Sequence, residues 1–411
     1  MVVIFRVKVV FSVEFLYIMF LFSGAFKESL NAPFDLAAIF LGLVLLKVVW
    51  GIIKRPVIKK SLIIPGALVI SLLFLMLTST MITGLTDSSI EKVIKFVFLT
   101  MPTFLLPFII IKNKESIQKV LLSVSILSIV LSLFAFPMII NRTGLFVGFN
   151  NGNYQGLART TGIGFIALAY FYLTAKKKVK LFVLPFLIIV SVTLISTGSR
   201  IPLIAIGAIG IYALINSFVI KKSDVLIKKN SIAGLTLAAV FIIVIPFLFS
   251  KGYFQTIVYR FKVLFEDNGG GASTLGRVDR IQSAIEMFKE NIIFGGGIGK
   301  FGQFYIGTEG VYAHNIFLEF ISELGLIGVL WLMVFLTFVL YHSVIQYKRA
   351  NRYLDSLQIA LISGFLFFFI NALVSGDINA NRALFAFGGF LAMSPYLKSE
   401  VKKASSKIAM Q

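Results

Sequence analysis

The chain contains no cysteine and only two histidines, His314 and His342. Without cysteine it can form no disulfide bond, thiolate nucleophile or cysteine-ligated metal site, although the compartment stays undecided. The two histidines flank one apolar segment from opposite ends, and the long polar segment 251–315 contains no Asp-x-Asp pair. Few ligands for a metal ion remain. We therefore expect a function that needs neither a metal nor another cofactor.

Charged residues are also scarce. They make up 14% of the chain, against 58% apolar residues and a mean hydropathy of +0.94, which excludes a water-soluble globular protein. A bilayer core about 30 Å thick is crossed by roughly 20 apolar residues in a helix. The sequence therefore predicts an all-α polytopic membrane protein, a single domain over 1–411 with about twelve transmembrane helices. The predicted spans are near 9–26, 36–53, 62–82, 93–111, 120–140, 157–175, 181–196, 201–220, 231–250, 316–345, 357–374 and 383–397.

The net charge of +21 does not indicate nucleic-acid binding, because the basic residues form short clusters between apolar spans. Lys and Arg are retained on the cytoplasmic side of short loops. Alternate connecting segments carry two to four of these residues, and the other short segments carry one or two. This alternation predicts a protein of the cytoplasmic (inner) membrane with both termini in the cytoplasm. The segment 251–315 is then an extracytoplasmic loop, and the first span is a retained signal anchor.

Arginine is distributed differently from lysine. Seven of the eleven arginines fall on the predicted outer side, whereas most lysines fall on the inner side. A guanidinium is planar, always charged and weakly hydrated, so it suits bidentate binding of phosphate or carboxylate near a low-dielectric boundary. Alternatively, these side chains reach lipid headgroups or pair with Asp279, Glu309 or Asp377. The seven outer arginines are Arg142, Arg159, Arg200, Arg260, Arg277, Arg280 and Arg382.

Arg200 ends the short polar turn Thr197-Gly-Ser-Arg200 between two apolar spans. So short a connection holds the guanidinium at the level of the outer headgroups, and the helix that starts there adds a partial positive charge. These features predict an anion-binding position that suits the diphosphate of a lipid carrier.

Two patterns occur inside the segment 251–315. Val278, Ile281, Ile285 and Phe288 recur at three- and four-residue steps, which is the period of a short amphipathic surface helix. The glycine-rich run 294–302 differs from a phosphate-binding loop, because Phe301 stands where that loop needs Ser or Thr. We interpret the glycines instead as a close backbone turn.

His314 lies in Ala313-His-Asn315, immediately before the tenth predicted span. With an unperturbed pKa of about 6.5, it can accept a proton or a hydrogen bond from a sugar hydroxyl. The alternative is a structural histidine that is satisfied by Asn315 or Glu319. Glu319 and Glu323 are four residues apart on one helix face and are predicted to point into the bundle, toward an arginine.

Four motifs in order carry a resemblance to a known family. They are Thr197-Gly-Ser-Arg200, Ser273-Thr-Leu-Gly-Arg277, Asn291-Ile-Ile-Phe-Gly-Gly-Gly-Ile-Gly-Lys-Phe301 and Ala313-His-Asn-Ile-Phe-Leu-Glu319. The series resembles the conserved region of the bacterial O-antigen ligase and Wzy-type O-antigen polymerase superfamily. The resemblance implies a GT-C-like membrane fold, outward arginines that bind the diphosphate of an undecaprenyl carrier, and a histidine that acts on the acceptor hydroxyl.

Carried onto this chain, the resemblance assigns catalytic roles to Arg200, Arg277 and His314. Diphosphate binding falls on Arg200, Arg277 and Arg280, and supporting roles fall on Asn315, Glu319 and Arg159.

Sugar transfer from a lipid diphosphate develops negative charge on the leaving group, which fixed guanidinium groups stabilise. We therefore predict a metal-independent, inverting glycosyltransferase that polymerises undecaprenyl-diphosphate-linked oligosaccharide units into a surface polysaccharide. A ligase that acts on lipid A-core or another acceptor stays open, and a flippase for the lipid-linked oligosaccharide is the alternative of another class. Expected partners are the lipid-linked oligosaccharide, membrane lipid, and polysaccharide-assembly proteins such as a flippase and a chain-length regulator.

Overall fold

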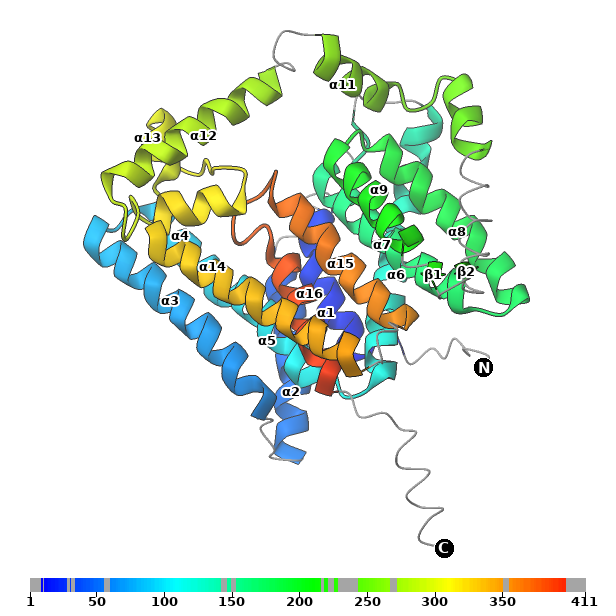
Figure 1. The fold of residues 1–411 in the computed structure, drawn as a ribbon, viewed down its shortest axis with the longest axis horizontal. Coiled ribbons are helices and arrows are strands. Elements are labelled where there is room, and N and C mark those ends of the chain that lie inside the picture. Colours follow the sequence, from blue (N-terminus) through cyan, green and yellow to red (C-terminus); the bar gives the residue numbers. More distant parts are fainter. Residues whose placement is uncertain are drawn as a thin grey trace, which may run out of the picture.

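The computed structural model of the protein describes residues 9, 11–27, 30, 34–54, 60–141, 146–148, 153–215, 218–220, 225–227, 243–266, 272–349 and 355–396. Helices make up most of this part of the chain (Figure 1). They are α1 (Val13–Phe22), α2 (Leu36–Lys54), α3 (Ile63–Thr83), α4 (Asp87–Lys95), α5 (Met101–Ile110), α6 (Lys114–Asn141), α7 (Tyr154–Thr174), α8 (Lys177–Ser196), α9 (Arg200–Ile215), α11 (Gln255–Glu266), α12 (Ala272–Glu290), α13 (Phe301–Ile306), α14 (Ile316–Arg349), α15 (Ser356–Ala372) and α16 (Arg382–Met393).

Seven helical segments of the described chain are long and apolar enough to cross a membrane, which makes the chain a predominantly helical, multi-pass membrane protein. They are Leu36–Lys54, Lys60–Thr83, Asp87–Ile110, Lys114–Asn141, Tyr154–Thr174, Lys177–Ser196 and Ile316–Ile345. Shorter apolar helices fall on four further predicted spans: Val13–Ala25, Arg200–Ile211, Ser356–Ala372 and Arg382–Met393. The count of about twelve helices stays a prediction, because most of the predicted span 231–250 lies outside the described residues.

The predicted span 201–220 is wrong at its end. Helix α9 is described as far as Ile215, and then β1 (Phe218–Ile220) pairs with β2 (Val225–Ile227) in a short antiparallel hairpin. Phe, Val and Ile are favoured in strands as well as in apolar helices. Hydropathy alone therefore predicted the end of this helix too far along the chain.

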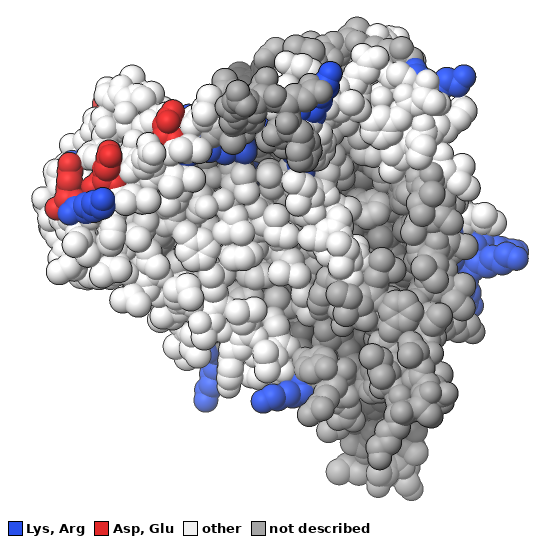
Figure 2. Space-filling model, turned by 45° about the horizontal axis from the view of Figure 1, so that its top comes forward, with Lys and Arg blue, Asp and Glu red and all other residues white. Residues whose placement is uncertain are grey.

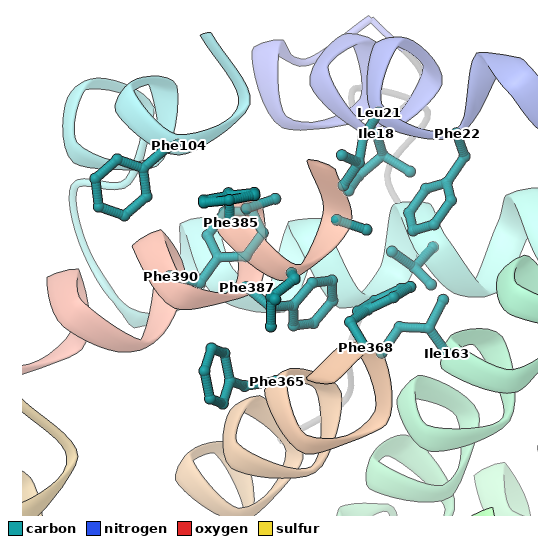
Figure 3. Close-up of a cluster of buried hydrophobic side chains, with 14 of the residues drawn as sticks. Ile18, Leu21, Phe22, Phe104, Ile163, Phe365, Phe368, Phe385, Phe387 and Phe390 are labelled. Atoms are coloured by element: carbon teal, nitrogen blue, oxygen red, sulfur yellow. The ribbon is translucent and has the colours of Figure 1, made fainter. Parts of the chain in front are cut away.

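Phenylalanine fills the centre of the bundle, where α16 packs against α1, α5, α14 and α15. Helix α16 is buried along almost its whole length. A Cβ atom on Gly389 would lie 2.9 Å from the carbonyl oxygen of Phe104, so glycine is what lets α16 approach α5. Such close backbone contact is the main source of helix association in a bilayer. Figure 3 shows the rings of Phe385, Phe387 and Phe390 among side chains from α1, α5, α7 and α15.

The glycine cluster at 295–299 packs into a break in α14. Gly325 has φ 63° and ψ −157°, so α14 is not helical at that residue. The N–H of Gly296 donates to the carbonyl oxygen of Ser322 at 2.8 Å, which bonds the cluster to the turn before the break. Gly295 has φ +71°, and a Cβ atom there would lie 2.5 Å from the carbonyl carbon of Glu323. The interpretation of these glycines as a close backbone turn is confirmed.

Helices α11, α12 and α13 lie at one end of the bundle, where α12 contacts α13 and α11 contacts α8 and α9 (Figure 1). A helix is present where the sequence predicts a surface helix, but its aliphatic side chains do not face the protein. Val278, Ile281 and Ile285 are exposed, whereas Ala284 and Met287 on the opposite side of α12 are buried. An exposed aliphatic stripe on a helix at this position suits contact with the membrane surface.

Candidate active site

Arg200 and Arg277 line one small pocket of about 30 Å³ together with Arg159 and Arg260. The four residues belong to α9, α12, α7 and α11, so side chains from four helices meet at this pocket. Tyr154 adds a phenol to the pocket wall. Within the described residues, the ion pairs all involve lysine, so no carboxylate is paired with any of these arginines.

Backbone carbonyl groups hold Arg200 and Arg260 in a reciprocal arrangement. Nη1 of Arg200 donates to the carbonyl oxygen of Arg260 at 3.0 Å, and Nη1 of Arg260 donates to that of Gly198 at 2.8 Å. Gly198 has φ +70°, which only glycine adopts readily. The sequence places Arg260 among the seven outer arginines but does not select it as a site residue. The only signal was its place among the outer arginines.

Within the described residues, the positive charge around this pocket is compensated only in part, because Asp377 acts electrostatically on Arg159 but no carboxylate is paired with the arginines. Burial, followed by the charges of Arg260 and Arg280, lowers the pKa of Arg277 from its usual value. Arg200 also lies within electrostatic range of Arg260 and Arg277. Like charges this close destabilise one another, and a bound polyanion would remove the repulsion. The pocket is therefore suited to an anion with several oxygens.

His314 lies within electrostatic range of Arg280, Arg277 and Arg159 but does not line the small pocket. Its φ of +58° is uncommon for a residue other than glycine, and such conformations cluster at functional sites. Its ring centre is 4.3 Å from that of Tyr312. Burial and then the charges of Arg280, Arg277 and Arg159 lower the pKa of His314 from 6.5 to about 4. The imidazole is therefore uncharged at neutral pH, which leaves one ring nitrogen as a hydrogen-bond acceptor.

The side chain of Asn315 forms hydrogen bonds with backbone groups and not with His314. Its Oδ1 accepts the N–H of Phe317 at 2.8 Å and so caps the start of α14. Its Nδ2 donates to the carbonyl oxygen of Leu373 at 2.8 Å, which ties α14 to the end of α15. Asn315 thus fixes the backbone next to the histidine, and in this sense it supports the candidate site.

Glu319 and Glu323 point into the bundle, as predicted, but the predicted arginine partner is wrong. Both are buried and form ion pairs with Lys92 of α4, at 2.6 Å for Glu323. Glu323 also accepts the N–H of Gly299 at 2.9 Å. A buried carboxylate without a cation is strongly unfavourable, and Lys92 supplies the cation for both residues. The ion pairs link α4 to α14, and the hydrogen bond from Gly299 links the glycine cluster to α14.

Arg280 lies near His314 and does not line the pocket that contains Arg200 and Arg277. Its Nη1 donates to the carbonyl oxygen of Gly276 at 2.9 Å, and its guanidinium is 5.4 Å from the ring centre of Tyr305. Its charge is the largest electrostatic cause of the lowered pKa of His314. The structure therefore connects Arg280 more closely with the histidine than with the other predicted diphosphate ligands.

Two other outer arginines differ in their surroundings. Arg159 lines the small pocket and donates to the carbonyl oxygen of Ser375 at 3.1 Å. Arg382 instead donates to the carbonyl oxygen of Leu21 at 3.0 Å, and so it ties α16 to α1. Arg142 lies outside the described residues. On the face shown in Figure 2, the acidic side chains lie at the upper left with a basic side chain beside them, and the other basic side chains lie toward the top and at the right and lower edges.

A comparison with known families covers the segment of the chain that contains this site. Residues 185–333 match the family described as O-antigen ligase, and the match contains Arg200, Arg260, Arg277, Arg280 and His314. No curated protein matches the chain. The family match supports a membrane enzyme of the O-antigen ligase or polymerase type, whose members are glycosyltransferase-like. The resemblance of this chain to the O-antigen ligase and Wzy-type polymerase superfamily is thereby confirmed.

Proposed function

We propose that the protein polymerises undecaprenyl-diphosphate-linked oligosaccharide repeat units into a surface polysaccharide, such as an O-antigen, a capsule or an exopolysaccharide. The family match supports an enzyme of this general type. The observation that carries the proposal is the pocket lined by Arg159, Arg200, Arg260 and Arg277, in which the described residues supply no paired carboxylate. Guanidinium groups in this state bind phosphate oxygens in bidentate fashion.

In the proposed reaction, Arg200 and Arg277 hold the diphosphate of the donor, with Arg280 nearby. The acceptor hydroxyl attacks the anomeric carbon from the face opposite the diphosphate, so the carbon–oxygen bond to the diphosphate breaks as the new glycosidic bond forms and the configuration inverts. The negative charge stays on the departing carrier diphosphate, where the guanidinium groups stabilise it. This chemistry assigns the charge stabilisation to arginine and needs no metal ion.

His314 takes the proton of the attacking hydroxyl in this proposal. With a pKa of about 4, the free imidazole is a hydrogen-bond acceptor but a weak base. Binding of the donor diphosphate compensates the charges of Arg277 and Arg280, which raises the pKa of the imidazole toward its usual value. The donor therefore improves the base that accepts the proton.

We place this reaction on the outer face of the cytoplasmic (inner) membrane. The distribution of Lys and Arg puts both termini in the cytoplasm and the segment 251–315 outside. The lipid-linked substrate then has to be delivered by a flippase, and a chain-length regulator is the expected partner at the same face.

A ligase uses the same donor side, and the matched family carries the ligase description. It differs in the acceptor, which is lipid A-core or another molecule. We favour the polymerase because the segment 251–315 is modest in length and shows no separate domain for a fixed acceptor. A flippase would catalyse no bond formation, so a transfer assay separates it from both enzymes.

The test uses the purified protein in detergent with the lipid-diphosphate-linked repeat unit. We expect a lengthened glycan and released carrier diphosphate, and little of either from the Arg277→Ala and His314→Ala double variant. Lys289→Ala, on the exposed side of the same helix as Arg277, is the control and should retain activity. Normal product from the double variant would remove the site assignment. Transport into vesicles without transfer would favour the flippase, and transfer only to lipid A-core would favour the ligase.

A further inference from the structure

A second, larger cavity of about 360 Å³ adjoins the arginine pocket and shares Gln155 and Arg159 with it. Its volume falls within the roughly 300–1,000 Å³ typical of small-molecule sites. The cavity lies between the ends of α1, α7 and α16 and the turn that joins α15 to α16. Besides the two shared residues, its polar lining includes Asp35, Asn153, Tyr312 and Asp377. Unlike the arginine pocket, this cavity is lined by carboxylate groups, which lie beside the basic side chains of Lys27, Lys95 and Arg382.

Not all polar groups around the cavity are free to bind a ligand. The guanidinium of Arg382 donates hydrogen bonds to backbone carbonyl oxygens, including that of Leu21. Asp377, in contrast, uses one carboxylate oxygen, Oδ1, which accepts the N–H of Ala380 at 2.6 Å. Within the described chain, neither its second oxygen nor the hydroxyl of Tyr312 takes part in a hydrogen bond. These two groups can bind a ligand without breaking a contact of the fold.

The position of Tyr312 connects the cavity with the candidate site. Its ring is 4.3 Å from that of His314, and it lies within electrostatic range of Asp377 and Arg159. A molecule that contacts Tyr312 in the cavity therefore lies close to the imidazole assigned to the attacking hydroxyl. Of the lysines that line the cavity, Lys27 is paired with Asp35 and Lys95 with Glu91. The free carboxylate oxygen of Asp377 disfavours a phosphate at this position, whereas it accepts hydrogen bonds from sugar hydroxyls.

Resting on the proposed function, we infer that this cavity binds the terminal sugar of the acceptor glycan. The free carboxylate oxygen of Asp377 accepts a hydrogen bond from one sugar hydroxyl, and the hydroxyl of Tyr312 bonds to another. The donor diphosphate then lies in the arginine pocket and the acceptor sugar in the larger cavity. Arg159 and Gln155 form the wall that the two sites share. Asp377 is in this arrangement an acceptor-binding residue.

The test uses two different molecules as donor and acceptor, so that the KM of each can be measured separately. The donor is the lipid-diphosphate-linked glycan, and the acceptor is an alkyl glycoside of the host's own repeat unit, which cannot donate because it lacks a diphosphate. Asp377→Asn keeps an oxygen for the N–H of Ala380 but removes the charge. It should raise the acceptor KM by about tenfold, as expected for a hydrogen bond to a charged group. Tyr312→Phe should raise the acceptor KM by roughly threefold, and the donor KM should stay within about twofold for both variants.

A second measurement does not depend on turnover. Saturation-transfer NMR follows the binding of the same alkyl glycoside to the protein in detergent. Weaker binding to Asp377→Asn, with normal binding to the exposed control Asp279→Asn, supports the sugar site. If wild-type protein binds the glycoside but transfers nothing, the proposed function fails and the sugar site stands. If both cavity variants bind and use the glycoside like wild type, or if only the donor KM changes, the inference is overturned.

Discussion

Under the proposed function, the pKa of His314 determines how activity responds to acid. Burial and three arginines lower this pKa from 6.5 to about 4. At pH 6, an imidazole with a pKa of about 4 is protonated in about 1% of molecules, whereas one with a pKa of 6.5 is protonated in about three quarters of them. Only the unprotonated ring can accept the hydroxyl proton. We therefore expect kcat/KM, which reports the free enzyme, to stay level from neutral pH down to about pH 5.

The sharpest perturbation is Arg280→Gln, because Arg280 is the largest electrostatic cause of the lowered pKa. Removing a positive charge near the ring favours the protonated form, so the pKa of His314 should rise and the acid limb of kcat/KM should move toward neutral pH. The chain has only two histidines, so His342→Gln leaves a single imidazole to follow by NMR between pH 4 and 8. Lys289→Gln, on the exposed side of α12, serves as the matched control.

Two results would refute this reasoning. If the imidazole of His314 titrates near 6.5 in the wild-type background, the arginines do not act on it as the structure indicates. If Arg280→Gln leaves the titration unchanged while the protein stays folded, Arg280 is not the main charge at the ring. Inorganic pyrophosphate, as a mimic of the donor diphosphate, should raise the pKa in wild type and raise it less in Arg280→Gln.

Three further predictions concern the fork of Arg200, the glycine cluster and the buried ion pairs. Arg200→Lys keeps the charge but loses the planar guanidinium and its paired N–H donors. We expect kcat/KM for the lipid-linked donor to fall by roughly 10- to 100-fold, without loss of folded protein. Activity equal to that of wild type would exclude a bidentate role for Arg200. Gly295→Ala should lower the free energy of unfolding by roughly 1–3 kcal/mol or more. The reason is that φ is +71° and a Cβ atom would lie 2.5 Å from the backbone of Glu323. The measurement is the Tm in detergent, which should fall. Gly210→Ala, where a Cβ atom meets nothing within 4 Å, should leave the Tm unchanged. Lys92→Met leaves two buried carboxylates without their cation and should destabilise by roughly 3–5 kcal/mol; an unchanged Tm would contradict the ion pairs.

Much of the fold could be predicted from hydropathy, because an apolar run of about 20 residues has few alternatives to a spanning helix in a bilayer. The limits of the helices were less secure. Residues 218–220 are as apolar as the helix before them, and only their pairing with 225–227 makes them a strand. The break at Gly325 was also not visible, since a glycine inside an apolar run predicts no particular φ and the break depends on the glycine cluster that packs there.

The candidate site was predictable in residue type but not in arrangement. Arg200 and Arg277 could be selected because a guanidinium at the outer boundary has few other uses. That Arg260 lies with them depends on the packing of α11 against α8 and α9, which no local pattern encodes. The partner of Glu319 was misassigned for the same reason, since Lys92 is far away in the sequence and lies in a polar stretch just before the predicted span 93–111. Asp377 was considered only as a partner for an arginine.

Four arginines around one pocket are unfavourable for the fold by itself. Burial and repulsion lower the pKa of Arg277, and the hydrogen-bond partners of Arg200, Arg260 and Arg159 are neutral carbonyl groups. Stability alone would favour a carboxylate or an apolar residue at one of these positions, so a function has to account for the cluster. Under the proposed function the donor diphosphate supplies the missing negative charge. Because Arg277 and Arg159 also lower the pKa of His314, the bound donor raises the basicity of the imidazole, while the effect of burial stays. The histidine then becomes an effective base only after the diphosphate is in place, which gives the reaction an order: donor first, then activation of the acceptor hydroxyl.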